Sequence, residues 1–94
     1  MIPEFSKEEQ KKLRAMGTVL KRLRKNAGYE TQEEFSDFIK MNRSQYQEYE
    51  SGVNMKTISI DRLVSHHNIT GKEFTLMVYD EMDNMDNKQI RKIS

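Results

Sequence analysis

Residues 31–52 read TQEEFSDFIKMNRSQYQEYESG, and this stretch decides the fold. Thr31 followed three residues later by Glu34 is the capping-box pattern that opens a helix. Apolar residues then recur at helical spacing, at Phe35, Phe38 and Ile39. The segment 40–42 is only long enough for a sharp turn, and its last residue, Asn42, is a good N-cap for a second helix. The stretch therefore predicts two short helices joined by a tight turn.

The second of these helices is expected over residues 43–51, with Gly52 ending it because glycine tolerates left-handed geometry. Tyr46 and Tyr49 are three residues apart, so we expect them on its buried side; base-stacking aromatics are the less favoured alternative. The side chains left exposed are polar or charged: Arg43, Ser44, Gln45, Gln47 and Glu48. Such side chains hydrogen-bond base edges, so this helix suits a DNA major groove.

A long first helix precedes this pair. Ser6 with Glu9 is a second capping box, which places the helix start near Lys7, and Gly28 ends the helix. Its apolar residues recur at steps of three and four, at Leu13, Met16, Leu20, Leu23 and Ala27, with Val19 widening the stripe. Gly17 costs this helix up to ~1 kcal/mol relative to alanine, and a close helix crossing would explain it.

A fourth helix follows the polar loop 53–56, with Thr57 or Ser59 as its N-cap and Asn68 at its end. Its predicted buried side holds Ile60, Leu63, Val64 and His67. The neighbouring His66 points about 100° away and is expected at the surface. The two histidines therefore cannot hold one metal ion together.

Thr70 with Glu73 is a third capping box and opens a fifth helix. Its apolar stripe is predicted to hold Phe74, Met77, Val78 and Met82, with Leu76 and Met85 off the main stripe. A dimer seam suits Met77, Met82 and Met85 better than an adaptable binding surface. The acids expected to be solvated are Asp80, Glu81, Asp83 and Asp86. The segment 86–94 either extends the helix or is disordered.

Composition bounds the class of protein. A chain of 94 residues is expected to form one domain, 1–94, with its core at about 6–79. The absence of cysteine excludes disulfides and thiolate metal sites and fits a reducing cytoplasm. No stretch approaches the ~20 apolar residues of a membrane span, and MIPEFSKEEQ contains no signal-peptide core. We therefore expect a soluble, cytoplasmic protein.

Charge is unevenly distributed along the chain. The net charge of +1 by itself does not indicate nucleic acid. Residues 1–29, however, carry eight of the sixteen Lys and Arg residues and three of the fifteen acids. A local basic face can contact phosphates even on a nearly neutral protein. A solvated, lysine-rich first helix without a partner is the alternative interpretation.

Over about 16–77 the chain resembles the lambda-repressor/Cro-like helix-turn-helix family, also called Xre-type. The pieces that carry the resemblance are LKRLRK at 20–25 with Gly28, TQEEF at 31–35, NRS at 42–44, and ESG at 50–52 followed by Ile69-Thr70. Each piece alone is a weak signal, and their order and separations make the match specific. Lys40 stands in the turn where the family usually has glycine. The resemblance implies an all-α, five-helix lambda-repressor-like DNA-binding domain.

The resemblance also implies which residues read bases. Arg43 and Ser44 match the family's first base-contacting positions, and Glu48 matches another. Arginine donates two hydrogen bonds to guanine, and a carboxylate accepts from cytosine. An Arg43 that touches phosphate only, and a Glu48 that merely avoids the backbone, are the alternatives. Gln45 is expected to contact a base or a phosphate, and the role of the exposed Gln47 stays open.

Further positions are implied to bind phosphate or to support the fold. Gln32 matches a glutamine that binds a phosphate and braces the recognition helix, and the free N–H groups of a helix N-terminus attract an anion there. The phosphate-binding residues predicted are Thr31, Gln32, Asn54 and Lys56. Arg24 and Glu50 match a partly buried salt bridge, which we interpret as structural.

The sequence offers no support for an enzyme, a cofactor or a small-molecule substrate, since it lacks a glycine-rich phosphate loop and a His–carboxylate arrangement. The predicted function is sequence-specific binding of double-stranded DNA by a homodimer, with half-sites about one helical turn apart. We favour a transcriptional repressor of a bacterium, phage or mobile element, or a self-repressing antitoxin. The alternative is a protein–protein interaction module on the same fold, which the near-neutral charge would suit.

Overall fold

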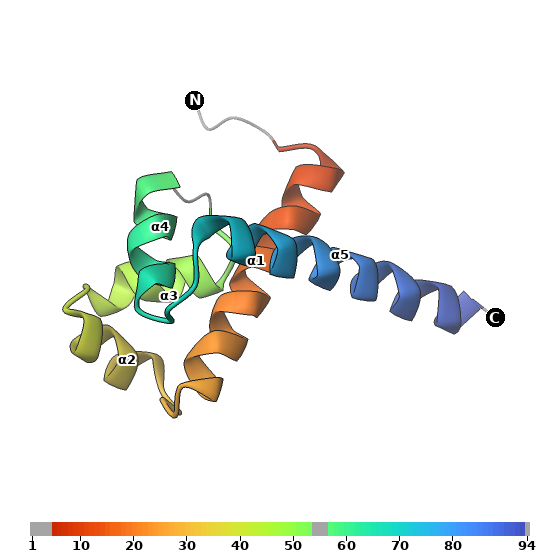
Figure 1. The fold of residues 1–94 in the computed structure, drawn as a ribbon. Coiled ribbons are helices and arrows are strands. Elements are labelled where there is room, and N and C mark those ends of the chain that lie inside the picture. Colours follow the sequence, from red (N-terminus) through yellow and green to blue (C-terminus); the bar gives the residue numbers. More distant parts are fainter. Residues whose placement is uncertain (1–4, 54–56, 94) are drawn as a thin grey trace.

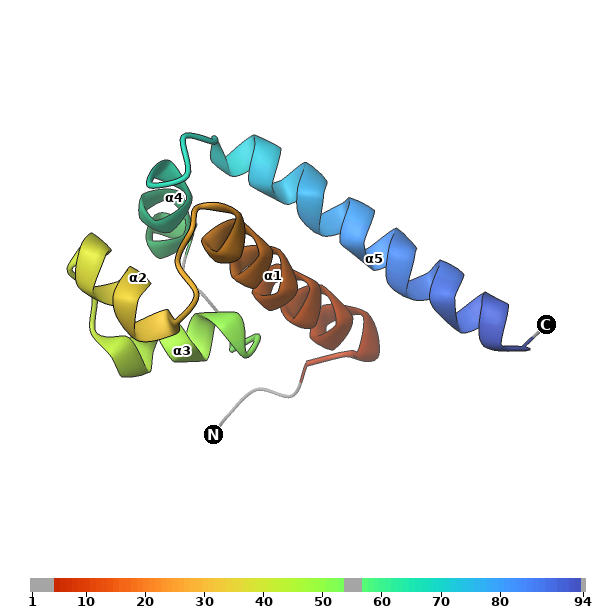
Figure 2. The same cartoon turned by 90° about the horizontal axis from the view of Figure 1, so that it is seen from below.

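The computed structural model describes the backbone of residues 5–53 and 57–93, and the side chains of this part of the chain except Thr57 and 87–93. Its regular structure is helical throughout: α1 (Lys7–Asn26), α2 (Gln32–Ile39), α3 (Arg43–Glu50), α4 (Thr57–Ser65) and α5 (Gly71–Ile93). Helix α1 lies between α3 on one side and α5 on the other (Figure 1 and Figure 2). Within the described residues, the prediction of five helices and an all-α class is confirmed. No helix in the described ranges is long and apolar enough to cross a lipid bilayer.

Local hydrogen bonds start the two long helices where the sequence predicts. At α1, the Ser6 hydroxyl accepts from the Glu9 N–H at 3.1 Å and the Glu9 carboxylate accepts from the Ser6 N–H at 2.8 Å. Thr70 and Glu73 make the same reciprocal pair at the start of α5, with both bonds at 3.1 Å. Each pair satisfies two backbone donors that a helix start would otherwise leave free.

The segment between α2 and α3 is the sharp turn that the sequence predicts. Lys40 ends α2 in the left-handed conformation, with φ 57°, a geometry that usually favours glycine. Asn42 caps α3, since its side-chain oxygen accepts from the Gln45 N–H at 3.2 Å. Helix α3 ends one residue earlier than expected: Ser51 is its C-cap, and Gly52 follows with φ 83°. This turn fixes the direction in which α3 leaves α2.

All five helices contribute to one core. Its buried apolar residues are Ala15, Met16, Val19, Leu20, Phe35, Tyr46, Tyr49, Leu63, Val64, Phe74, Val78 and Met82. Tyr46 and Tyr49 are therefore core residues, as predicted. The prediction for Phe38 is wrong, because the buried side of α2 runs through Phe35 and Ser36 and leaves Phe38 59% exposed. Ala27 is also exposed, because α1 has already ended there.

Helix α4 begins differently from the prediction. Thr57 and Ser59 are its first and third residues, so neither is the N-cap, and most of the predicted loop 53–56 lies outside the described residues. Asn68 has a left-handed φ of 58°, in the turn that follows the helix. The helix ends at Ser65, three residues before the predicted end at Asn68. His66 is exposed, as expected, and His67, predicted on the buried side of the helix, is half-buried in the turn. The His67 ring stacks on Phe35 with 5.1 Å between centroids.

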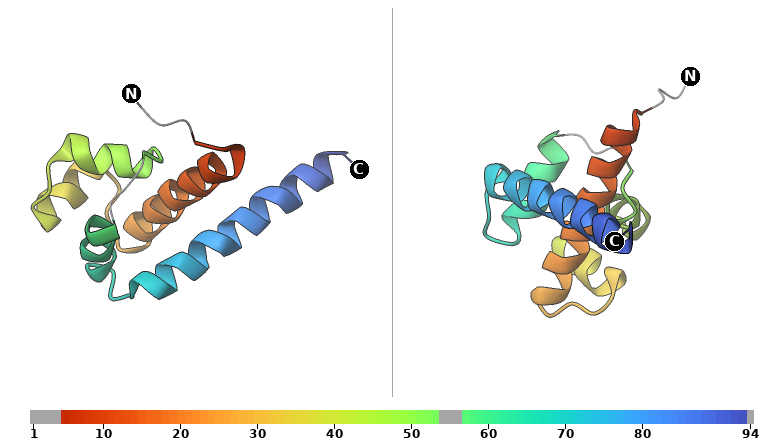
Figure 3. Two further views of the ribbon diagram at one scale, coloured as in Figure 1. Left: turned by 90° about the horizontal axis from the view of Figure 1, so that it is seen from above. Right: turned by 90° about the vertical axis from the view of Figure 1, so that its right-hand side faces the viewer.

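Helix α5 packs across α1, and its last turns extend beyond α1 (Figure 3). Met82 is buried in this packing, and Met77 and Met85 rest half-buried against the same core. The predicted methionine seam is therefore wrong for Met82, which contacts its own chain. Of the acids expected to be solvated, Glu81 is instead buried and bonded to Arg22 of α1. Asp86 is bonded to Lys11 of α1, but its side chain stays 52% exposed, as expected. The tail continues α5 as helix to Ile93.

Candidate nucleic-acid interface

The polar side of α3 is fixed by the burial of its two tyrosines. Tyr46 and Tyr49 face the core, so the opposite side of the helix points to solvent. Ser44, Gln47 and Glu48 lie at helical steps of three and four on that side, and all three are exposed. Helix α3 therefore forms a ridge whose outer edge consists of hydrogen-bonding side chains.

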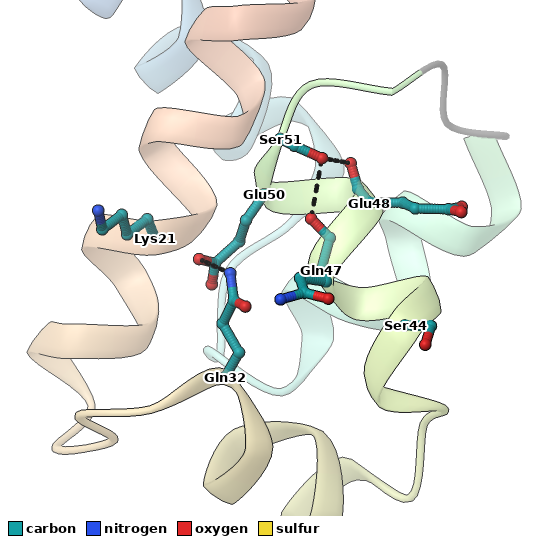
Figure 4. A pocket seen from close by; sticks show the side chains of 7 residues that line it. All are labelled: Lys21, Gln32, Ser44, Gln47, Glu48, Glu50 and Ser51. Atoms are coloured by element: carbon teal, nitrogen blue, oxygen red, sulfur yellow. Dashed lines mark hydrogen bonds between the residues drawn. The ribbon is translucent and has the colours of Figure 1, made fainter.

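A groove of about 510 Å³ lies along one flank of this ridge, between α1, the start of α2 and α3 (Figure 4). Its lining residues are Lys21, Gln32, Ser44, Gln47, Glu48, Glu50 and Ser51. The groove thus brings together four residues that the sequence singles out for DNA contact: Gln32, Ser44, Gln47 and Glu48. Lys21 is a lining residue that the sequence analysis did not single out. The sequence does indicate that Lys21 belongs to a basic segment of the first helix, but not that it lies beside α3.

Beneath the groove, a buried ion pair joins α1 to α3. The Arg24 Nε donates to Glu50 Oε2 at 2.8 Å, and the side chains of Arg24 and Glu50 are only 4% and 3% exposed. Arg24 also donates from Nη1 to the Tyr29 carbonyl at 2.8 Å. Gln32 donates from Nε2 to Glu50 Oε1 at 2.9 Å, so it ties the start of α2 to the end of α3. The predicted structural pair is present, and Gln32 braces α3 as expected.

This network lowers the pKa of the Glu50 carboxyl. Burial alone would raise it, but the hydrogen bonds from Arg24 and Gln32 stabilise the charged form and outweigh burial. The carboxylate also holds the pKa of Arg24 above its ordinary value. The charged Glu50 carboxylate therefore links α1, α2 and α3 through hydrogen bonds, and all of these bonds are made within the protein.

Gly17 permits the close approach of α1 and α3 that this network needs. A Cβ atom at this position would overlap the Glu50 carbonyl oxygen and lie 2.9 Å from the Glu50 carbonyl carbon. The backbones of the two helices thus meet where only a hydrogen atom fits. The helix crossing predicted at Gly17 is confirmed, and its partner is the last residue of α3.

Arg43 stands at the first turn of α3, outside the groove. Its Nη1 lies 3.5 Å from Glu33 Oε2, and both side chains are mostly exposed. An exposed pair of this kind contributes about 0–1 kcal/mol, so it holds the guanidinium only weakly. Arg43 can therefore exchange this carboxylate for a partner in solution.

The other predicted contact residues are placed differently. Gln45 lies on the opposite flank of α3 from the groove and donates from Nε2 to the Tyr49 hydroxyl at 3.1 Å. The Thr31 hydroxyl accepts from the Glu34 N–H at 3.1 Å and donates to the Glu34 carboxylate at 3.0 Å. The predicted capping box is thus only half formed, and this hydroxyl is engaged within α2. Asn54 and Lys56 lie outside the described residues.

Comparison of the chain with protein-family models, curated proteins and solved structures gives no match. The chemistry of α3 and its surroundings is therefore the basis for assigning a function.

Proposed function

We propose that the chain is a lambda-repressor-like helix-turn-helix protein that binds duplex DNA sequence-specifically, with α3 in the major groove. The observation that carries this proposal is the contrast between the two sides of α3. Tyr46 and Tyr49 are buried, whereas the outer side is an uninterrupted series of exposed donors and acceptors. A major groove about 12 Å wide admits one helix, and these side-chain types hydrogen-bond base edges there.

Rigid placement of α3 supports the same proposal. Side chains that read bases must be held on an element whose position is fixed. Helix α3 is fixed at its start by the Asn42 cap and at its end by the Arg24–Glu50–Gln32 network. Both ends of α3 are thus fixed in place. Its outer face does not contact the core formed by the described residues.

The roles within this interface follow from position. Arg43 and Ser44, at the start of α3, would contact bases first, with Arg43 suited to guanine. Glu48, one turn further on, would accept from cytosine and exclude other pairs. Gln32 retains an amide N–H beyond its bond to Glu50 and sits at the N-terminus of α2, where a backbone phosphate is attracted.

Sequence-specific binding of this kind suits a homodimer acting as a transcriptional repressor. Two copies would place two α3 helices on half-sites about one helical turn apart, on an operator with approximate two-fold symmetry. With Met82 buried within its own subunit, Leu76 and Tyr79 are the large exposed apolar side chains that the described part of α5 offers to a second copy.

Arg43→Ala is expected to weaken binding to a selected duplex by about 1–3 kcal/mol and to relax preference at one base pair, because a bidentate base contact is lost. Titration against that duplex and its single-base variants measures both effects. Lys72→Ala removes one charge on α5 and should leave every preference intact. A uniform loss over all sequences in Arg43→Ala would show that Arg43 contacts phosphate only.

A protein-interaction module is the second candidate, and the acids that line the α3 groove favour it. Arg24 compensates Glu50, and Glu48 offsets Lys21, so this flank has no net positive charge and attracts phosphate weakly. The two functions differ in their response to salt. DNA binding predicts that the logarithm of the affinity falls linearly with the logarithm of salt concentration, with a slope that reports several phosphates. A protein-interaction module predicts no retained duplex.

A further inference from the structure

A second hollow lies along the other flank of α3, between the α2–α3 turn and α4. Its volume is about 320 Å³. The hydrogen-bond donors among its lining side chains are Lys40, Asn42, Gln45, Tyr49, Ser59, Arg62 and His66. No carboxylate lines it within the part of the chain that the structure describes. We call it the basic hollow.

The two flanks of α3 therefore differ in charge. The groove described above is lined by Lys21, Glu48 and Glu50, and the charge of Glu50 is compensated by Arg24 beneath it. The basic hollow is lined by Lys40 and Arg62, which carry two positive charges, and by no acid. The basic hollow on the side of α4 therefore attracts an anion beside α3 more strongly than the charged side chains of the groove do.

The donors of the basic hollow are available to a ligand. Among the described side chains, neither Lys40 nor Arg62 has a carboxylate within 4.0 Å. The Tyr49 hydroxyl accepts from Gln45 at 3.1 Å, which leaves its own hydrogen to donate. Asn42 uses its side-chain oxygen to cap α3, so its amide N–H groups stay free.

Helix α3 is a ridge between these two hollows. Gln47 lines one and Gln45 lines the other, with Ser44 and Glu48 toward the outer edge between them. A helix inside a major groove has a phosphate backbone on each side. With α3 in the groove, one backbone would run on the side of α4, which is the side where the basic hollow lies.

We propose that the basic hollow binds a backbone phosphate of duplex DNA, with Lys40 and Arg62 supplying the charge and Asn42 and Tyr49 supplying neutral donors. This inference rests on the proposed function, because it assigns the strand on the α4 side of α3. It adds a phosphate site on α4 to the positions that the sequence indicates. The site contributes affinity without base preference, since phosphate contacts carry no sequence information.

The test compares Arg62→Gln and Lys40→Gln with the unaltered chain, by duplex titration over a range of salt concentrations. Each variant should weaken binding to the same degree on all sequences. In the double variant, the negative slope of log affinity against log salt should become less steep by about 0.9, the value for one lost phosphate. Arg62→Lys keeps the positive charge, so its slope should equal that of the unaltered chain. Lys72→Gln removes an equal charge on α5 and should leave the slope unchanged.

The outcomes separate this inference from the proposed function. If the unaltered chain binds duplex and both glutamine variants keep its affinity and slope, the basic hollow does not bind phosphate, while the proposed function stands. If the unaltered chain binds no duplex, the proposed function itself is wrong. Lys40 and Arg62 are both exposed, so thermal unfolding of each variant should match that of the unaltered chain and confirm an intact fold.

Discussion

Glu50→Ala is expected to destabilise the folded chain by about 3–5 kcal/mol, because it leaves the Arg24 guanidinium buried without its carboxylate. Arg24 is only 4% exposed, and its Nε and Nη2 both donate to Glu50. Gln32 would lose its partner at the same time. Small domains are stable by about 5–15 kcal/mol in total, so the variant should be marginally folded. Urea unfolding at neutral pH measures the loss.

Two variants control for the nature of this loss. Glu48→Ala removes an exposed carboxylate from the same helix, and its effect should stay within about 0.5 kcal/mol. The double variant Arg24→Met/Glu50→Leu replaces the whole pair by apolar side chains and should regain much of the stability, since no charge remains buried alone. If Glu50→Ala lowered the free energy of unfolding no more than Glu48→Ala, the Arg24–Glu50 pair would not hold α3 in place.

The same pair predicts how stability depends on pH. The pKa of Glu50 is lower in the folded chain than in the unfolded chain, because hydrogen bonds from Arg24 and Gln32 outweigh burial. Its contribution is therefore fully present above the unfolded pKa, about 4.3, and is lost as pH falls through the lower folded pKa. Glu50→Ala should remove this part of the acid sensitivity.

Gly17→Ala should destabilise the chain by about 3 kcal/mol, at or above the upper end of ordinary overpacking. The added methyl group would overlap the Glu50 carbonyl oxygen, which is backbone and cannot swing aside. Helices α1 and α3 would have to separate, which would also lengthen the contact between Arg24 and Glu50. Alanine favours a helix by up to ~1 kcal/mol over glycine, so a net loss requires the clash. Thermal or urea unfolding measures the change.

Gly28→Ala is the matched control for the added methyl group. Gly28 has φ 97°, and a methyl group added there would meet no described atom beyond its chain neighbours within 4 Å, so the cost there is backbone strain. We expect that loss to be about 1 kcal/mol, clearly below that of Gly17→Ala. A stabilised Gly17→Ala variant would mean that α1 and α3 do not meet as closely as described.

The features that the sequence predicts best depend on neighbouring residues in the chain. The Ser6–Glu9 and Thr70–Glu73 caps form as expected, because every group that they need lies within three residues. The sharp turn at Lys40 is equally local. Phe38 shows the limit of this reasoning. Its spacing fits a helical stripe, but the direction in which α2 packs decides which side of the stripe is buried.

Contacts between distant elements were harder to predict. Glu81 looks like one of several solvated acids in the sequence, yet it is buried against Arg22, 59 positions away. From the sequence, Met82 is expected in an interface with a second copy. The packing of α5 on α1 buries it instead within its own chain. In the interface, Arg24 and Glu50 were found through the resemblance. Lys21 of α1 and Arg62 of α4 line the two hollows beside α3 from other helices, and no short-range pattern shows which basic residue reaches such a position.

The central claim, that α3 reads duplex sequence, is tested most directly by affinity selection of random duplexes with the purified chain near physiological salt, followed by sequencing. We expect a motif with two-fold symmetry and half-sites about 10–10.5 base pairs apart. The same selection with Arg43→Ala should lose one position of that motif and keep the rest. Enrichment without a shared motif, or no retained DNA, would contradict the claim and leave α3 as a protein-binding surface.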